Sequence, residues 1–255
     1  MAATVLAAQL YTVRQFLQTP TDIARSLSRV RALGYQAVQL SALGPIEPRE
    51  LRKIADSEGL TICATHVTFE KLRDEPDAVI EEHKTLGCEH VAIGSLPKEY
   101  QGSAAGFTRF AREAEAVGQK LAAAGLTFSY HNHSFEFEKY EGRLALDIIF
   151  EESDPRYVKA ELDTYWIQHG GGDPAAWIKK LAHRLVLLHL KDMTIRNRTQ
   201  TFAEVGEGNL NWVSIMSAAK AAGVRWYIVE QDTCERDPFE SLAISLRNLR
   251  NMGLQ

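Results

Sequence analysis

Several apolar, strand-like runs of this sequence end in side chains that could do chemistry. Histidines or carboxylates follow each of four such runs. Because the carboxyl ends of parallel strands meet at one edge of a sheet, these groups would gather there, as a metal site with dispersed ligands requires. The residues that follow the four runs are His131, His133 and Glu136, then Asp163, then His189, Lys191 and Asp192, and last Glu230 and Asp232.

Asp163, His189 and Glu230 close three consecutive runs and would lie within reach of one ion. Taken singly, Asp163 could cap the following turn, His189 could be a hydrogen-bonded core histidine, and Glu230 could pair with a nearby base. Their joint position at the same end of adjacent strands favours a metal site. Carboxylates with an imidazole suit Mn²⁺, which we expect first, or Co²⁺, Mg²⁺ or Zn²⁺.

Eight strands alternate with eight helices, as the periodicity of apolar residues shows. The alternation has no GxGxxG turn and no linker, so it predicts a closed (β/α)₈ TIM barrel, a single α/β domain over residues 1–255. In such a barrel the active site lies at the carboxyl ends of the strands. Strands are expected over residues 5–10, 37–40, 60–66, 90–93, from Leu126, 158–162, 185–188 and 226–229. Helices are expected over residues 21–33, 48–57, 77–86, 103–124, 144–152, 174–181, 212–222 and 238–251.

Composition and charge indicate which kinds of partner the protein could bind. The 255 residues are 45% hydrophobic, with 29 basic and 33 acidic side chains and a net charge of −4. This balance argues against a nucleic-acid or membrane partner and favours a small polar substrate. Cys63, Cys88 and Cys234 are widely spaced and indicate reduced thiols. The early apolar stretch over residues 2–10 lacks a basic flank and is too short to span a bilayer, so we expect a soluble cytoplasmic protein.

The chain resembles a known family over nearly its whole length. It is similar to the xylose-isomerase-like TIM barrels, also called the sugar phosphate isomerase/epimerase group, which include tagatose epimerase, inosose dehydratase and 3-keto-glycoside lyases. The family's metal is usually held by Glu, Asp, His and Glu from strands five to eight, and Asp163, His189 and Glu230 match the last three. The segments that carry the resemblance are residues 9–14, 130–137, 161–166, 189–192, 206–212 and 229–231.

Strand five departs from the family pattern. The usual Glu position falls on or near His131, and a carboxylate appears only at Glu136. Alternation puts His131 and His133 on one face of the strand, so both can point into the rim. Either His131 is the fourth ligand or the loop folds Glu136 back to the ion.

The resemblance implies a divalent-metal-dependent sugar isomerase or epimerase that abstracts a proton beside a carbonyl through an enediolate. Glu230 is expected to act on one face of the substrate, and His133, His131 or Glu136 on the other. Lys191 would bind a substrate oxygen or neutralise the enediolate, unless it is simply a solvated lysine. The alternative is a lyase or dehydratase acting on a keto-sugar, inosose or 3-keto-glycoside with the same metal site. A DNA-repair endonuclease is disfavoured, because the chain is acidic and lacks that enzyme's extra ligands.

Further residues are expected to contact the sugar. Gln9 and His66 end strands one and three, Trp166 could pack against a sugar face, and Arg196 leaves open a phosphate on the substrate. Dimers and tetramers are common in the family, so the resemblance also suggests a homo-oligomer.

Overall fold

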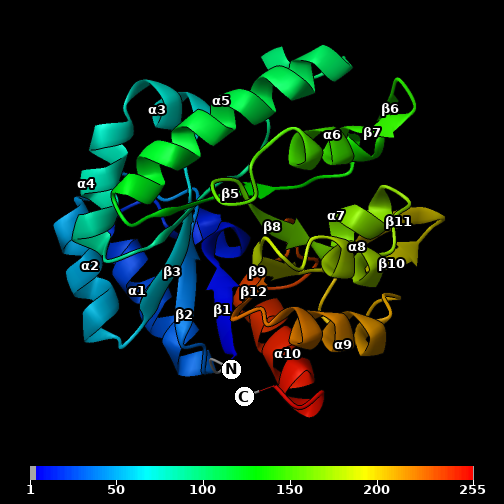
Figure 1. Ribbon diagram of the computed structural model, residues 1–255. Coiled ribbons are helices and arrows are strands. Elements are labelled where there is room, and N and C mark those ends of the chain that lie inside the picture. The colour runs from blue at the N-terminus through cyan, green and yellow to red at the C-terminus, as the bar shows by residue number, and fades with distance from the viewer. Residues whose placement is uncertain (1–3, 255) are drawn as a thin grey trace.

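The computed structural model describes residues 4–254, which form a closed barrel of eight parallel strands (Figure 1). Around the barrel the strands follow the order β1-β12-β9-β8-β5-β4-β3-β2. The predicted TIM barrel is therefore confirmed, although residues 1–3 and 255 of the expected domain lie outside the described residues. The barrel strands are β1 (Val5–Gln9), β2 (Ala37–Leu40), β3 (Thr61–His66), β4 (His90–Ile93), β5 (Thr127–His131), β8 (Lys159–Asp163), β9 (Leu185–Leu190) and β12 (Trp226–Val229).

Helices surround the strands, and all eight predicted helices are present. The first shows why they form: Thr19 caps its start, and Ile23, Leu27 and Val30 recur at helical spacing and are buried against the sheet. Within residues 4–254, no helix is long and apolar enough to cross a membrane. The eight are α1 (Pro20–Leu33), α2 (Pro48–Ser57), α4 (Pro76–Leu86), α5 (Ala104–Ala123), α6 (Ala145–Glu151), α8 (Pro174–Lys180), α9 (Trp212–Ala222) and α10 (Pro238–Asn251).

Short elements in the loops were not predicted from the sequence. Strand seven was also expected to end at residue 188, but β9 continues to Leu190, so His189 lies inside the strand. The unpredicted elements are η1 (Leu10–Phe16), α3 (Phe69–Asp74), η2 (Lys98–Tyr100), η3 (Phe135–Phe137), the hairpin of β6 (Lys139–Tyr140) and β7 (Arg143–Leu144), α7 (Thr164–His169), and the hairpin of β10 (Asp192–Arg196) and β11 (Thr199–Ala203).

A small apolar cluster lies apart from the main core, which packs the strands against the helices. All seven of its buried members lie on barrel strands at positions before the polar strand ends, so they close the barrel beneath those ends. The inward-facing positions beyond this cluster are free to carry polar groups. Its buried residues are Ala7, Ala37, Cys63, Ala64, Leu187, Trp226 and Ile228.

Asp192 anchors the loop that follows the β10–β11 hairpin. Its buried carboxylate accepts hydrogen bonds from the backbone N–H groups of Met193, Gly206, Gly208 and Leu210 and from the indole of Trp212. A side chain at position 208 would collide with this carboxylate, so a glycine is required there. The anchor fixes the chain next to the strand end that carries Lys191.

His83 links a helix to the barrel and predicts a pH effect on stability. It is buried on α4, with Nε2 2.6 Å from the Thr65 hydroxyl on β3 and Nδ1 2.7 Å from the Val79 carbonyl. Burial lowers the pKa of His83 below its ordinary value of 6.5. Below that pH the unfolded chain therefore binds a proton that the folded protein does not, so His83 makes the protein less stable as the pH falls.

The free energy of unfolding of the wild type should fall between about pH 7.5 and about pH 5.5. We expect it to fall less in His83→Gln, by up to about 1.4 kcal/mol per pH unit. Urea unfolding at the two pH values measures it. Thr65→Val, which removes the hydroxyl partner but keeps the imidazole, should lower the free energy of unfolding at both pH values and leave its change with pH as in the wild type. If His83→Gln also leaves that change with pH as in the wild type, His83 is not its source.

Candidate active site

Polar side chains fill the barrel interior above the small apolar cluster. Parallel pairing places Asp163 of β8 beside His189 of β9, and His189 lies beside Ile228, two residues before Glu230. Since side chains alternate along a strand, each of these strands aims a titratable group inward at this level. The polar residues buried here are Gln9, Gln39, His131, Glu161, Asp163, His189, Lys191 and Glu230.

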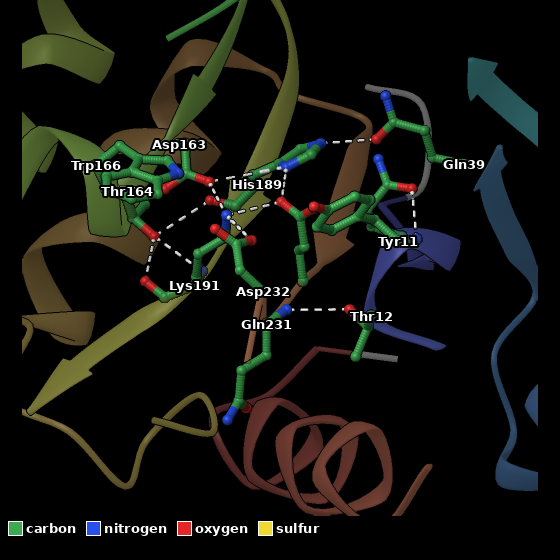
Figure 2. Close-up of polar contacts among 12 residues, drawn as sticks. Tyr11, Thr12, Gln39, Asp163, Thr164, Trp166, His189, Lys191, Gln231 and Asp232 are labelled. Carbon is green, nitrogen blue, oxygen red and sulfur yellow. Dashed lines mark hydrogen bonds and ion pairs between the residues drawn. The ribbon is translucent and has the colours of Figure 1, made fainter. Parts of the chain in front are cut away.

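His189 is the centre of this cluster, with a different set of neighbours at each ring nitrogen (Figure 2). Its Nδ1 lies 2.9 Å from Glu230 Oε2 and 3.8 Å from Asp163 Oδ2. Its Nε2 lies 2.6 Å from Glu161 Oε1 and 2.7 Å from Gln39 Oε1. Burial disfavours the charged ring, but Glu161 and Glu230 outweigh burial and raise the pKa of His189 to about 10.

Lys191 is a fully buried lysine surrounded by carboxylates. Its ammonium lies 3.0 Å from Asp163 Oδ2, 2.8 Å from Glu230 Oε2 and 2.8 Å from Asp232 Oδ1. These three acids outweigh the effect of burial and hold the pKa of Lys191 well above its ordinary value. The same ammonium lies 5.5 Å from the centre of the Trp166 ring, at cation–π distance. Lys191 is thus buried within this cluster and is not a solvated lysine.

Four residues could hold a metal ion together. One ligand atom each from His131, Asp163, His189 and Glu230 lies within 4.8 Å of every other. Asp163 uses Oδ1 to cap α7 through the N–H of Trp166, while its buried Oδ2 makes no hydrogen bond in the described chain, although Lys191 is near. Both expected roles of Asp163, helix cap and candidate ligand, are therefore compatible.

His131 also has an open ring nitrogen. Its Nδ1 is buried and, within residues 4–254, has no hydrogen-bond partner. Burial and the charge on His189 lower the pKa of His131 well below its ordinary value, so the ring is neutral, the state a metal ligand needs. A buried nitrogen of His131 without a hydrogen bond in the described residues, with the carboxylates of Asp163 and Glu230 and the imidazole of His189 around it, fits a divalent cation.

A cavity of about 330 Å³ opens onto two of the four candidate ligands, His131 and Glu230. His131 and His133 both line it, as their alternation along β5 predicted, and their ring centres lie 5.1 Å apart. Burial and the nearby Lys191 lower the pKa of His133 to about 4, so this ring too is neutral near pH 7. The residues around the cavity are Tyr11, Ser41, His66, Gly94, Ser95, His131, His133, Lys191, Glu230 and Asp232.

Glu136 does not join this cluster. It is buried in η3, where it accepts hydrogen bonds from the Tyr130 hydroxyl (2.7 Å) and the His133 N–H (2.9 Å). Tyr130 packs against Phe110 of α5, on the helix side of β5. Burial raises the pKa of Glu136 to about 7. Of the two alternatives for strand five, the structure brings His131 to the other candidate ligands and leaves Glu136 as an anchor for the loop.

Of the residues expected to contact the substrate, some lie at the cavity and others do not. His66 lines the cavity and lies 3.2 Å from Glu161, and the Trp166 ring is tilted against the His133 ring with ring centres 5.2 Å apart. Gln9 is fully buried and accepts a hydrogen bond from the Tyr11 N–H. Arg196 is exposed on the β10–β11 hairpin and pairs with Glu235, so the structure does not bring it into the cavity.

Sequence reasoning missed Glu161 and Gln39, and it placed Asp232 at the same strand end as Glu230 without giving it a role. Glu161 has no exposed surface and contacts Gln39, His66 and His189. The sequence did contain a sign of Glu161, because side chains alternate between the two faces of a strand. Glu161 precedes Asp163 by two residues on the same strand, so it must face the same side. Asp232 follows Glu230 by two and reaches Lys191.

The fold and the cluster define a TIM barrel with a candidate metal centre at the carboxyl ends of its strands. Comparison with known families agrees: the model of the xylose isomerase-like TIM barrel matches residues 27–252. The chain belongs to this family.

Relatives of known sequence are distant. An inosose dehydratase of Geobacillus thermodenitrificans (strain NG80-2) is 28% identical over 142 residues, 49% of this chain and 47% of that protein, so the match spans less than half of that relative. The rhizopine catabolism protein MocC of Rhizobium meliloti is 24% identical over 270 residues, 91% of this chain and 82% of that protein.

A solved structure confirms the fold. The crystal structure of a sugar phosphate isomerase/epimerase from Parabacteroides distasonis ATCC 8503 superposes with a TM-score of 0.85 at 24% identity. The superposition covers 98% of this chain and 94% of the other.

The two alternatives for strand five predict different mutant behaviour. His131→Ala should weaken binding of Mn²⁺ or Co²⁺ at least about tenfold, since it removes a ligand. Glu136→Ala should leave metal affinity unchanged but lower the free energy of unfolding by about 2–4 kcal/mol, because it leaves the Tyr130 hydroxyl and the His133 N–H buried without their acceptor. Metal titration and urea unfolding measure the two effects, and the reverse pattern would make Glu136 the ligand.

Proposed function

We propose that this protein is a divalent-metal-dependent enzyme that isomerises or epimerises a sugar by removing a proton beside its carbonyl group. The observation that carries the proposal is the convergence of His131, Asp163, His189 and Glu230 beside a cavity at the mouth of the barrel. The relatives include an isomerase/epimerase and an inosose dehydratase, and their names support a keto-sugar or inosose as the substrate class.

The four residues would hold the ion, and Mn²⁺ is the ion we propose first, with Co²⁺, Mg²⁺ and Zn²⁺ as alternatives for the same mixed nitrogen and oxygen ligands. When bound, it would supply positive charge beside the substrate oxygens on which negative charge develops as the proton leaves.

Glu230 is the proposed base on one face of the substrate. Both its contacts, to His189 and Lys191, go to Oε2, so within the described chain Oε1 is left to accept the proton. Burial disfavours the carboxylate, but Lys191 and His189 outweigh burial and lower the pKa of Glu230, which keeps it ionised. The electron pair of the broken C–H bond then passes into the enediolate.

His133 and Lys191 complete the proposed machinery. His133 is neutral and lines the cavity, so it can accept or return a proton on the other face. Lys191 keeps its positive charge beside the same cavity and would stabilise the negative charge of the enediolate. His66, Trp166 and Gln9 stay proposed substrate contacts.

Dehydration is the second candidate function, and the inosose dehydratase relatives favour it. The same proton abstraction gives an enolate that can expel a hydroxyl group from the next carbon. His66, which lines the cavity next to His131 with ring centres 5.2 Å apart, could protonate that hydroxyl as it leaves as water. The two reactions differ in product mass, because only dehydration removes a water.

Turnover in deuterated water tests the proton abstraction. We expect solvent deuterium at the carbon beside the carbonyl when keto-sugars, inososes and 3-keto-glycosides are screened with Mn²⁺ and followed by NMR. Mass spectrometry of the same samples separates isomerisation from dehydration. A product that forms without taking up deuterium would exclude the mechanism and indicate hydride transfer.

Substitutions at Lys191 and Asp163 should separate catalysis from metal binding. Lys191→Met removes a positive charge that competes with the ion for Asp163 and Glu230, so metal should bind at least as tightly as in the wild type. Turnover should fall about 100-fold or more, since a charge beside the enediolate is lost. Asp163→Ala should instead weaken metal binding, as measured by elemental analysis after dialysis. Weaker metal binding in Lys191→Met would contradict its assigned role.

A further inference from the structure

The side of His189 that faces away from the candidate metal position has a structure of its own. Two oxygens lie close to Nε2: Oε1 of Glu161 at 2.6 Å and Oε1 of Gln39 at 2.7 Å. Both oxygens are hydrogen-bond acceptors, so Nε2 must carry a proton to satisfy either one. Oε2 of Glu230, 2.9 Å from Nδ1, is also an acceptor, so without an ion both ring nitrogens carry a proton. An ion held by Nδ1 would displace the proton on that nitrogen and leave the other proton on Nε2, with the Nδ1 lone pair facing Asp163 and Glu230.

Glu161 decides the orientation of Gln39 as well. The Gln39 amide donates from Nε2 to Glu161 Oε1 at 2.6 Å, which leaves its own oxygen facing His189. If the amide turned over, its oxygen would face the carboxylate and its NH₂ group would face the ring proton. Both contacts would then be repulsive, so the negative charge of Glu161 excludes that arrangement.

Glu161 is itself held in one position. It has no exposed surface, and its second oxygen, Oε2, lies 3.2 Å from Nε2 of His66 on β3. Residues from β2, β3 and β9 thus fix a carboxylate of β8 from three sides. Such a buried carboxylate is costly unless each oxygen is paired, and here each one is.

We infer that Glu161 is a positioning residue for the metal site: through Gln39 and directly, it keeps the ring proton of His189 on Nε2 and turns the Nδ1 lone pair toward the ion. This inference rests on the metal-dependent function proposed above. A hydrogen bond to the far nitrogen of a ligating histidine typically orients the ring, and its loss weakens metal binding about 10–100-fold.

A Gln at position 161 would undo this arrangement with little change in volume. Its amide could donate to Nε2 of His189, and the Gln39 amide would be free to turn over. Each change favours the tautomer with the proton on Nδ1, where it can donate to Glu230 and block the position of the ion. Glu161→Asp keeps the charge but shortens the side chain, so it should act in the same direction more weakly.

Metal titration of the full chain tests the inference. After removal of bound metal with a chelator, Co²⁺ is titrated into wild type, Glu161→Gln and Glu161→Asp, with its visible absorption and the heat of binding as readouts. We expect Glu161→Gln to bind one equivalent about 10–100-fold more weakly than wild type. Glu204→Gln is the matched control, because Glu204 is a buried carboxylate paired with Ser241 and Arg236 away from the site, and it should bind Co²⁺ as wild type does.

A spectroscopic readout separates positioning from general loss of structure. In the Zn²⁺-loaded wild type, ¹⁵N NMR should show the proton of His189 on Nε2, and thermal unfolding of the metal-free variants shows whether they are folded. If Glu161→Gln does not fold, Glu161→Asp supplies the affinity measurement.

The outcomes are distinct. Equal Co²⁺ affinity in wild type and Glu161→Gln overturns this inference alone and leaves the proposed function standing. A wild type that binds two equivalents, of which Glu161→Gln loses one, makes Glu161 a ligand of a second ion together with His66 and overturns it as well. A wild type that binds no metal overturns both the inference and the proposed function.

Discussion

The site depends on the pairing of its buried carboxylates with two positively charged side chains, Lys191 and His189. Asp163 and Glu230 lie in the barrel interior with Asp232 nearby, and Lys191 contacts all three. An unpaired buried charge costs several kcal/mol, so any side chain that moved away would leave a partner uncompensated. The network therefore holds its own geometry, and the positions of the candidate ligands are set before an ion or a substrate arrives.

The barrel makes this network possible, because parallel strands deliver side chains to one level. Asp163 and His189 are direct neighbours in register, and the apolar cluster with Trp226 and Ile228 closes the space beneath. The strands are covered by helices on the outside, so the interior is shielded and electrostatic contacts there are stronger than in water. A site built on strand ends is also more rigid than one built on loops alone.

Some buried carboxylates of this chain hold the backbone in place, whereas others are candidate metal ligands. The hydrogen-bond partners of each carboxylate decide between the two roles. Asp192 gathers N–H groups of the loop after the β10–β11 hairpin, and Glu136 holds the turn after β5 through His133 and Tyr130. Both have their oxygens occupied by donors. His131, by contrast, keeps a buried nitrogen without a hydrogen bond in the described residues, and Asp163 turns its second oxygen to the Lys191 ammonium and not to a backbone donor. Both are therefore candidate ligands.

Much of this could be predicted from the sequence. Apolar periodicity determined the eight strands and eight helices, because each element must bury one face whatever its neighbours are. The strand-end positions of Asp163, His189 and Glu230 followed, since a barrel collects strand ends in one place. The short elements, such as α7 and η3, could not be predicted, because caps and tertiary contacts rather than periodicity stabilise them.

Only the tertiary structure decided which polar groups meet. Glu161 finds its partner Gln39 122 positions away along the chain, and Gln39 lies 150 positions from His189. No local pattern encodes such pairings, because they depend on how the closed barrel sets the register of strands far apart in sequence. The sequence by itself determined that carboxylates and imidazoles would reach the mouth of a barrel; the path of the chain after β5 decided that His131 and not Glu136 joins them, since Glu136 is drawn to the donors Tyr130 and His133 on the helix side.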